Sequence, residues 1–216
     1  ALVFFGGWAC ILGANQKLDL LGIALVHSFI LGILIWAGAA YSKCHFNPAV
    51  TIALIVTKKL EVIEGILFMC FQLPGAIAGA VLILLSCPSY LGTIFQHGLG
   101  CPHMNRLYST FCVICVEIVS TFMLMLVILA LSSEKQAANY SWCIGLTVGL
   151  NILCSGPITG TAMNPFRYMG PAIVSGQLSD WYIYLVSPCI GSIAASFIYP
   201  WLFDPITSDK SVIHQP

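Results

Sequence analysis

Charged side chains are almost absent from most of this chain, and their scarcity is the strongest constraint on its fold. Eight charged residues occur between Leu60 and Leu202: Glu61, Glu64, Arg106, Glu117, Glu134, Lys135, Arg167 and Asp180. Over all 216 residues, 59% are hydrophobic and 7% are charged, whereas about 25% are charged in a typical soluble domain. A soluble fold with so few charges would expose large apolar patches, so we expect a protein that crosses a membrane several times.

Apolar stretches near the length needed to cross a bilayer, about 20 residues, recur along the chain. We expect spanning helices over residues 1–13 (a short one), 20–41, 62–86, 109–132, 140–157 and 181–203. Two further apolar segments, 47–57 and 164–175, are too short to cross and are expected to be re-entrant. The pattern predicts six spanning helices and two half-length helices in a single domain, residues 1–216.

The two half-length segments begin with the same dipeptide, which indicates an internal repeat. Asn47-Pro48-Ala49 opens the first segment, and Asn164-Pro165-Phe166 opens the second. With three spans in each half, residues 1–86 and 109–203 are predicted to form two repeats that enter the membrane from opposite sides. Broken helices that meet at mid-membrane in inverted repeats mark a permeation site.

An Asn-Pro motif suits the start of a helix inside a membrane. Proline at the first helical position has no N–H to leave unpaired, and asparagine caps the helix while keeping amide N–H groups to donate. Two helix N-termini that face each other present positive partial charge, which repels cations. Asn47 and Asn164 are therefore predicted to donate to a passing water, which then cannot relay a proton.

These features resemble the aquaporin, or major intrinsic protein, family over essentially the whole chain. The matching segments are HFNPAVT, QLPGAIAGA, MNPFRYMGPA and SPCIGSIAAS. The second half is most similar to the aquaporin eight and plant tonoplast intrinsic protein types. The resemblance implies an all-α membrane protein with six transmembrane helices and two re-entrant half-helices in an inverted repeat. It also implies a passive, non-enzymatic channel without cofactor or metal, assembled as a homotetramer in the plasma membrane or an organelle membrane.

Four residues occupy the positions that form the narrowest constriction in that family. They lie 20 residues before the first motif asparagine, 12 and 3 residues before the second, and 3 residues after the second: His27, Ile152, Thr161 and Arg167. Histidine followed by isoleucine is the pattern of the aquaporin eight and tonoplast types. The resemblance thus implies that water, ammonia and hydrogen peroxide pass, while protons and ions are excluded.

Each constriction residue has an expected physical role. His27 would supply a hydrogen-bond donor or acceptor, and Ile152 an apolar wall without hydrogen-bonding demand. Small Thr161 would leave room for a slightly wider gate. Arg167, whose charge is tolerable in a membrane only in a water-lined cavity, would repel protons and other cations.

Further polar residues are expected to support the pore. Glu117, deep in a spanning segment, would accept hydrogen bonds from backbone N–H groups of a re-entrant loop, and Gln72 would serve a similar purpose. The first-half counterpart of Glu117 would lie near or before residue 1, so we expect the first repeat to begin in a preceding stretch with a matching glutamate. His45 is expected to be a structural loop residue, with pH gating as the alternative. Cys44 and Cys154 are candidate sites for block by thiol reagents.

Three other readings remain open. Phe166 stands where the family usually has alanine, and a pore blocked by it would indicate a poorly conducting junctional or scaffold protein. A glycerol-type channel is the second alternative, which Tyr168 disfavours because glycerol channels carry aspartate there. A proton-coupled transporter that uses His27 and Glu117 is the third. The formal net charge of zero gives no indication of nucleic acid as a partner.

Overall fold

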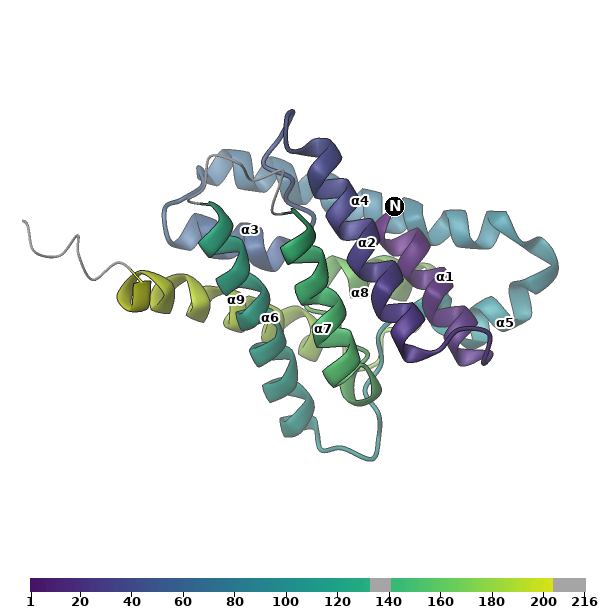
Figure 1. The fold of residues 1–216 in the computed structure, drawn as a ribbon. Helices are drawn as coiled ribbons and strands as arrows, with labels where there is room; N and C mark the ends of the chain where they lie inside the picture. The colour runs from purple at the N-terminus through teal and green to yellow at the C-terminus, as the bar shows by residue number, and fades with distance from the viewer. Residues whose placement is uncertain (133–140, 204–216) are drawn as a thin grey trace, which may run out of the picture.

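The computed structural model describes residues 1–132 and 141–203, and every regular element in these ranges is helical (Figure 1). The longer helices are α1 (Leu2–Ala14), α2 (Leu20–Gly38), α4 (Val62–Ser86), α6 (Thr110–Ser132), α7 (Ser141–Thr159) and α9 (Trp181–Phe203). The half-length helices are α3 (Pro48–Val56) and α8 (Pro165–Ser175). The predicted all-α architecture is confirmed, and the expected bounds agree with the observed ones to within a helical turn.

Five of these helices, namely α2, α4, α6, α7 and α9, are long and apolar enough to cross a membrane. The sixth, α1, is apolar but has only 13 residues. The exterior of the bundle is apolar, as large exposed side chains along α4 illustrate: Ile63, Leu67, Phe71 and Leu85. Polar side chains such as Glu117 and Thr121 are buried instead. This distribution is the one expected where lipid replaces water around the protein.

The connection from α4 to α6 contains helical structure that the sequence pattern did not predict. It holds η1 (Pro88–Tyr90), α5 (Leu91–Gln96) and η2 (Gly98–Gly100). Ile94 and Leu99 are fully buried in the core cluster that also contains Val3 of α1. This short segment is therefore ordered by burial against the bundle, since helices of this length are not stable alone.

Close helix pairs depend on glycine at the contact. The packing of α6 along α9 and of α2 along α7 is the most extensive in the described chain. A Cβ on Gly191 would lie 2.2 Å from the carbonyl oxygen of Ile118, and one on Gly145 would lie 2.3 Å from that of Ser28. Both pairs therefore need a residue without a side chain at the crossing, as in other membrane bundles.

The half-helices are held inside the bundle by the longer helices. Helix α3 packs against α9 and α4, and α8 packs against α4, with α3 in blue and α8 in pale green in Figure 1. The Ser192 hydroxyl donates to the carbonyl oxygen of Ala49 at 2.8 Å, which ties α3 to α9. The ends of α3 and α8 also contact each other. The division into repeats 1–86 and 109–203 stays a prediction.

Candidate functional site

Asparagine caps the N-terminus of each half-helix. The Asn47 Oδ1 atom accepts from the backbone N–H of Ala49 at 3.0 Å, and Pro48 is the first residue of α3. The Asn164 Oδ1 atom accepts from the N–H groups of Phe166 and Arg167, at 3.0 and 3.2 Å. These bonds use N–H groups that have no partner within the helix.

The two caps are also bonded to each other's backbone. Asn47 Nδ2 donates to the carbonyl oxygen of Met163 at 2.7 Å, and Asn164 Nδ2 donates to that of Phe46 at 2.8 Å. Each amide carries two N–H bonds, so one N–H of each is not used by these cross-bonds. The cross-bonds hold the ends of α3 and α8 together where both asparagines line a cavity.

A cavity of about 770 Å³ runs past the asparagines and brings most of the predicted pore residues together. It is lined by His27, His45, Asn47, Ile152, Thr161, Asn164 and Arg167. Apolar side chains form much of the remaining wall, among them Leu31, Val50, Leu54, Leu124, Ile128 and Val148. A few polar groups opposite an apolar wall are typical of a site for small neutral molecules.

His27 and Arg167 lie in contact on one side of this cavity. Arg167 Nη2 lies 3.2 Å from His27 Nε2, and His27 Nδ1 lies 2.9 Å from the carbonyl oxygen of Ile23. A carbonyl only accepts and a guanidinium only donates. Both contacts are therefore hydrogen bonds only if the imidazole is neutral, with its proton on Nδ1 and its Nε2 accepting from Arg167.

Arg167 has two further partners, a backbone carbonyl, as expected for a charged residue in a membrane, and a cysteine that sequence reasoning did not identify. Its Nη1 donates to the carbonyl oxygen of Gly100 at 3.1 Å, and its Nη2 donates to Cys10 Sγ at 3.3 Å. Its Nε–H has no partner among the described residues. Three of the five guanidinium N–H bonds are thus engaged; of the other two, the one on Nε is buried and the second one is on Nη1.

The Thr161 hydroxyl is held by a neighbouring serine. Ser155 Oγ donates to the carbonyl oxygen of Asn151 at 2.7 Å, and Thr161 Oγ1 lies 2.8 Å from Ser155 Oγ. Since the Ser155 proton is used for Asn151, Thr161 donates its own proton to Ser155. The Thr161 hydroxyl, at a residue that lines the cavity, therefore retains its capacity to accept a hydrogen bond.

Glu117 contacts the loop that carries Thr161 into the second motif. Its carboxylate accepts from the Thr159 hydroxyl at 2.7 Å and from the backbone N–H groups of Ala162 and Met163, each at 2.9 Å. Thr161 and Met163 have φ values of 46° and 49°, in the left-handed region that costs energy for residues other than glycine. The three bonds to Glu117 offset that cost.

The loop before the first motif is held by Gln72. Its Nε2 donates to the carbonyl oxygen of His45 at 2.7 Å and to Thr51 Oγ1 at 3.1 Å. The His45 ring lies on Phe68, with ring centroids 4.8 Å apart. Burial and, to a lesser degree, the Lys43 ammonium lower the pKa of His45 to about 4, so this ring is neutral at physiological pH.

Comparison with known proteins identifies the family. The model of the family described as "Major intrinsic protein" matches residues 1–199. The chain belongs to the major intrinsic protein family. Nodulin-26 from Glycine max is 34% identical over 203 residues, which is 92% of this chain and 72% of the relative. Probable aquaporin TIP3-2 from Arabidopsis thaliana is 32% identical over 210 residues, covering 94% of this chain and 76% of the relative.

The fold agrees with a solved structure of the same family. The X-ray structure of the aquaglyceroporin from Plasmodium falciparum matches with a TM-score of 0.82 at 25% identity, covering 96% of this chain and 93% of that one. Major intrinsic proteins are passive channels for water and small neutral solutes, so this chain is a multi-pass integral membrane channel protein.

Phe166 is the residue at which this major intrinsic protein departs from the Asn-Pro-Ala pattern. It packs against a core cluster that includes Val3, Ala76, Ile83 and Leu99. It is not one of the described residues that line the cavity. The aromatic ring therefore fills space between α8 and its neighbours and lies outside the described lining of the cavity.

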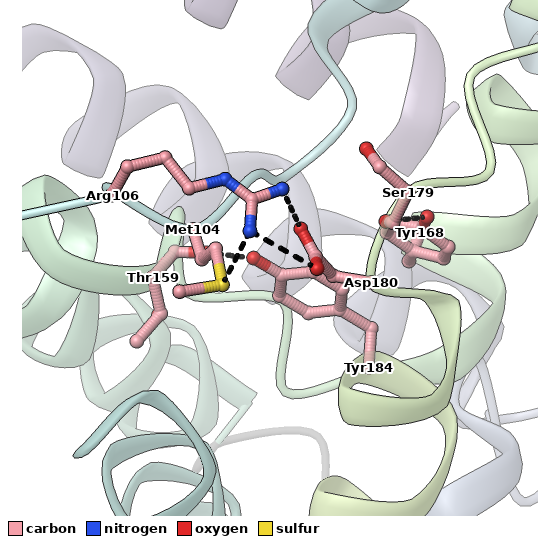
Figure 2. A network of polar contacts seen from close by, with 7 residues as sticks. All are labelled: Met104, Arg106, Thr159, Tyr168, Ser179, Asp180 and Tyr184. Carbon is pink, nitrogen blue, oxygen red and sulfur yellow. Dashed lines mark hydrogen bonds and ion pairs between the residues drawn. The ribbon is translucent and has the colours of Figure 1, made fainter. Parts of the chain in front are cut away.

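A network of polar contacts, which sequence reasoning also missed, holds the end of α7 and the loop that follows it (Figure 2). Tyr184 donates to the carbonyl oxygen of Thr159 at 2.8 Å and stacks on Tyr168 at 4.7 Å. Arg106 pairs with Asp180 at 2.6 Å, a pair that Figure 2 draws together with Tyr184. The network anchors the segment that leads to Thr161.

Proposed function

We propose that this channel conducts water together with ammonia and hydrogen peroxide, and that it excludes protons and ions. The observation that carries the proposal is the placement of His27, Ile152, Thr161 and Arg167 on one cavity. These four residues would form its selectivity filter. The filter then combines the fixed donors of Arg167 with the apolar side chain of Ile152.

Ammonia fits the hydrogen-bonding groups of this filter. The nitrogen lone pair of ammonia accepts one hydrogen bond, which a free N–H of Arg167 supplies. Its own N–H groups find an acceptor at the Thr161 hydroxyl, whose proton is given to Ser155. Ile152 demands no hydration of the passing molecule. Ammonium lacks the lone pair and carries a positive charge, so Arg167 opposes its entry.

Proton exclusion would come from the two half-helices. The N-termini of α3 and α8 face the same cavity with positive partial charge. Asn47 and Asn164 each keep one amide N–H beyond their cross-bonds. A water that accepts from these amides is oriented by them and cannot pass a proton along the file.

The assembly is proposed to be a homotetramer in the plasma membrane or an organelle membrane, with one pore in each protomer. The exposed apolar side chains of α4 support contact with lipid or with a neighbouring protomer. Chemical cross-linking of membranes that contain the protein tests this, because a series ending at the tetramer is expected and a series ending at the dimer contradicts it.

Stopped-flow light scattering on proteoliposomes tests the function. Under osmotic and ammonium gradients we expect fluxes well above those of empty vesicles, linear in the gradient and with a low activation energy. Osmotic permeability equal to that of empty vesicles would favour the junctional or scaffold alternative. Glycerol flux comparable to water flux would favour the glycerol-channel alternative, and saturable uptake driven by a pH gradient would favour the transporter.

A further inference from the structure

Helix α1 supplies none of the four proposed filter residues, yet three of its residues contact groups that form the filter. Gly6 lies against His27, Gly7 lies against Gly100, and Cys10 accepts from Arg167. Gly6 and Cys10 are four residues apart, so they share one face of the helix. This face forms the wall behind the His27–Arg167 pair.

Gly6 leaves the space that the His27 ring occupies. A Cβ at Gly6 would lie 2.5 Å from His27 Nε2, 3.0 Å from Cδ2 and 3.1 Å from Cε1. A Cβ atom does not lie within 3.0 Å of a non-bonded heavy atom, so a residue larger than glycine would displace the His27 ring. The ring atom nearest to that Cβ is Nε2, which accepts from Arg167.

Gly7 sets the position of a second partner of Arg167. A Cβ at Gly100 would lie 2.5 Å from the Cα and the carbonyl oxygen of Gly7, so the two backbones are in direct contact. Gly100 has a φ of 73°, which favours glycine. The carbonyl oxygen of Gly100 then accepts from Arg167 Nη1 at 3.1 Å.

Cys10 occupies one N–H bond of Arg167 that would otherwise be free. Its Sγ lies 3.3 Å from Nη2, the atom that also donates to His27. Both N–H bonds of Nη2 are thereby engaged. A thiol is a weak acceptor, so this contact directs the guanidinium without binding it as tightly as an oxygen would.

We propose that Gly6 and Cys10 are specificity-determining positioning residues of the filter. Gly6 sets where the His27 ring lies, and Cys10 determines how many N–H groups of Arg167 remain for a solute. The inference rests on the proposed function, since it assigns a cause to the selectivity of that same filter. It adds α1 to the elements that decide which molecules pass.

Substitutions at Cys10 test the second part in proteoliposomes. Cys10→Ala frees one N–H and adds space, so we expect the ratio of glycerol to water permeability to rise about fivefold, the size of one hydrogen bond. Cys10→Ser supplies a stronger acceptor and should leave the ratio at or below the wild-type value. Cys115→Ala, at a half-buried cysteine of α6, is the matched control and should leave the ratio unchanged. If Cys10→Ala and Cys115→Ala have the same ratio of glycerol to water permeability, the proposed role of Cys10 is overturned.

Substitution of Gly6 tests the first part, with a second change as the rescue. Gly6→Ala should reduce water permeability severalfold, because the added methyl group pushes His27 into the cavity. Gly6→Ala combined with His27→Ala removes the ring, so water permeability should return to at least the level of His27→Ala alone. If the double variant has a water permeability as low as that of Gly6→Ala, misfolding and not ring displacement caused the loss, and the proposal is overturned.

The wild-type protein separates failure of this inference from failure of the proposed function. Wild-type osmotic permeability equal to that of empty vesicles would contradict the channel itself. A conducting wild type whose ratio of glycerol to water permeability does not rise in Cys10→Ala would contradict the role of Cys10 and leave the proposed function standing.

Discussion

Asn47 and Asn164 each donate a side-chain hydrogen bond to the carbonyl oxygen of the residue immediately before the other, at distances of 2.7 and 2.8 Å. The two contacts are equivalent although the residues belong to different halves of the chain. Each asparagine therefore caps its own half-helix, ties it to the opposite one and keeps one amide N–H that these bonds do not use. The packing of the half-helices and the proposed contact with solute would thus depend on the same pair of side chains.

Replacement of Asn47 should weaken both the fold and the flux. Asn47→Ala removes the cap of α3 and the bond to Met163, so we expect a loss of about 1–2 kcal/mol in stability and a severalfold lower osmotic permeability. Thermal unfolding in detergent and stopped-flow scattering measure the two effects. Asn105→Ala is a matched control, because the Asn105 side chain makes the same two kinds of bond at an exposed site. It accepts from the backbone N–H of Leu107 and donates to the carbonyl oxygen of Pro157. Equal unfolding temperatures for the two variants would contradict the prediction.

Replacement of His27 by phenylalanine should change selectivity. The new ring is larger and has no acceptor for Arg167, so the gate narrows and loses a charge-assisted hydrogen bond. We expect ammonia permeability to fall about tenfold and water permeability to fall less, both measured in the same vesicle preparation. His97→Phe, in the connection between α4 and α6, is the control. An equal loss of both fluxes would count against the assignment of His27 to the filter.

Glu117 is expected to matter for stability and not for proton coupling. Glu117→Gln replaces one carboxylate oxygen by an NH₂ group that cannot accept from Thr159, Ala162 or Met163, at a cost of about 1–3 kcal/mol. The unfolding temperature should drop accordingly, while flux through the remaining folded protein stays linear in the solute gradient. Glu61→Gln, at the start of α4 where the side chain makes no cap bond, serves as control. Uptake that depends on a pH gradient in the wild type and is lost in Glu117→Gln would support the transporter alternative instead.

Thiol reagents should distinguish the two cysteines that the sequence nominated. Cys44 lines the cavity, whereas Cys154 is exposed on α7 and is not one of the described lining residues. We expect an organic mercurial to reduce osmotic permeability of the wild type and of Cys154→Ser. Cys44→Ser should resist the reagent. Resistance of Cys154→Ser together with sensitivity of Cys44→Ser would reverse the assignment.

His45 is expected to make no contribution to pH dependence in the physiological range. Its pKa is lowered to about 4, so the ring stays neutral until the pH falls near that value. Osmotic permeability should therefore be constant from about pH 8 to about pH 5, the range in which an unperturbed histidine changes charge. A decrease over this range that disappears in His45→Gln would support pH gating.

Much of this protein was predictable from sequence because the relevant signals are local. Apolar length alone located the helices α2, α4, α6, α7 and α9, since each must satisfy its backbone internally and face lipid. The two Asn-Pro motifs located the starts of α3 and α8, because proline and asparagine suit a helix N-terminus wherever it lies. Counting from the motifs then nominated the residues that line the cavity, His27 and Arg167 among them.

Tertiary structure decided what surrounds those residues. Cys10 and Arg167 are 157 residues apart in the chain, and no local pattern links a half-buried cysteine to a distant guanidinium. The short helices α5 and η2 are ordered because Ile94 and Leu99 are buried in a core cluster formed with α1 and α4. Phe166 raised the question of a blocked pore, and the structure packs its ring against the core cluster that contains Val3 and Leu99, outside the described lining of the cavity. Hydropathy and caps are properties of a segment, whereas the direction of a side chain depends on which segments pack around it.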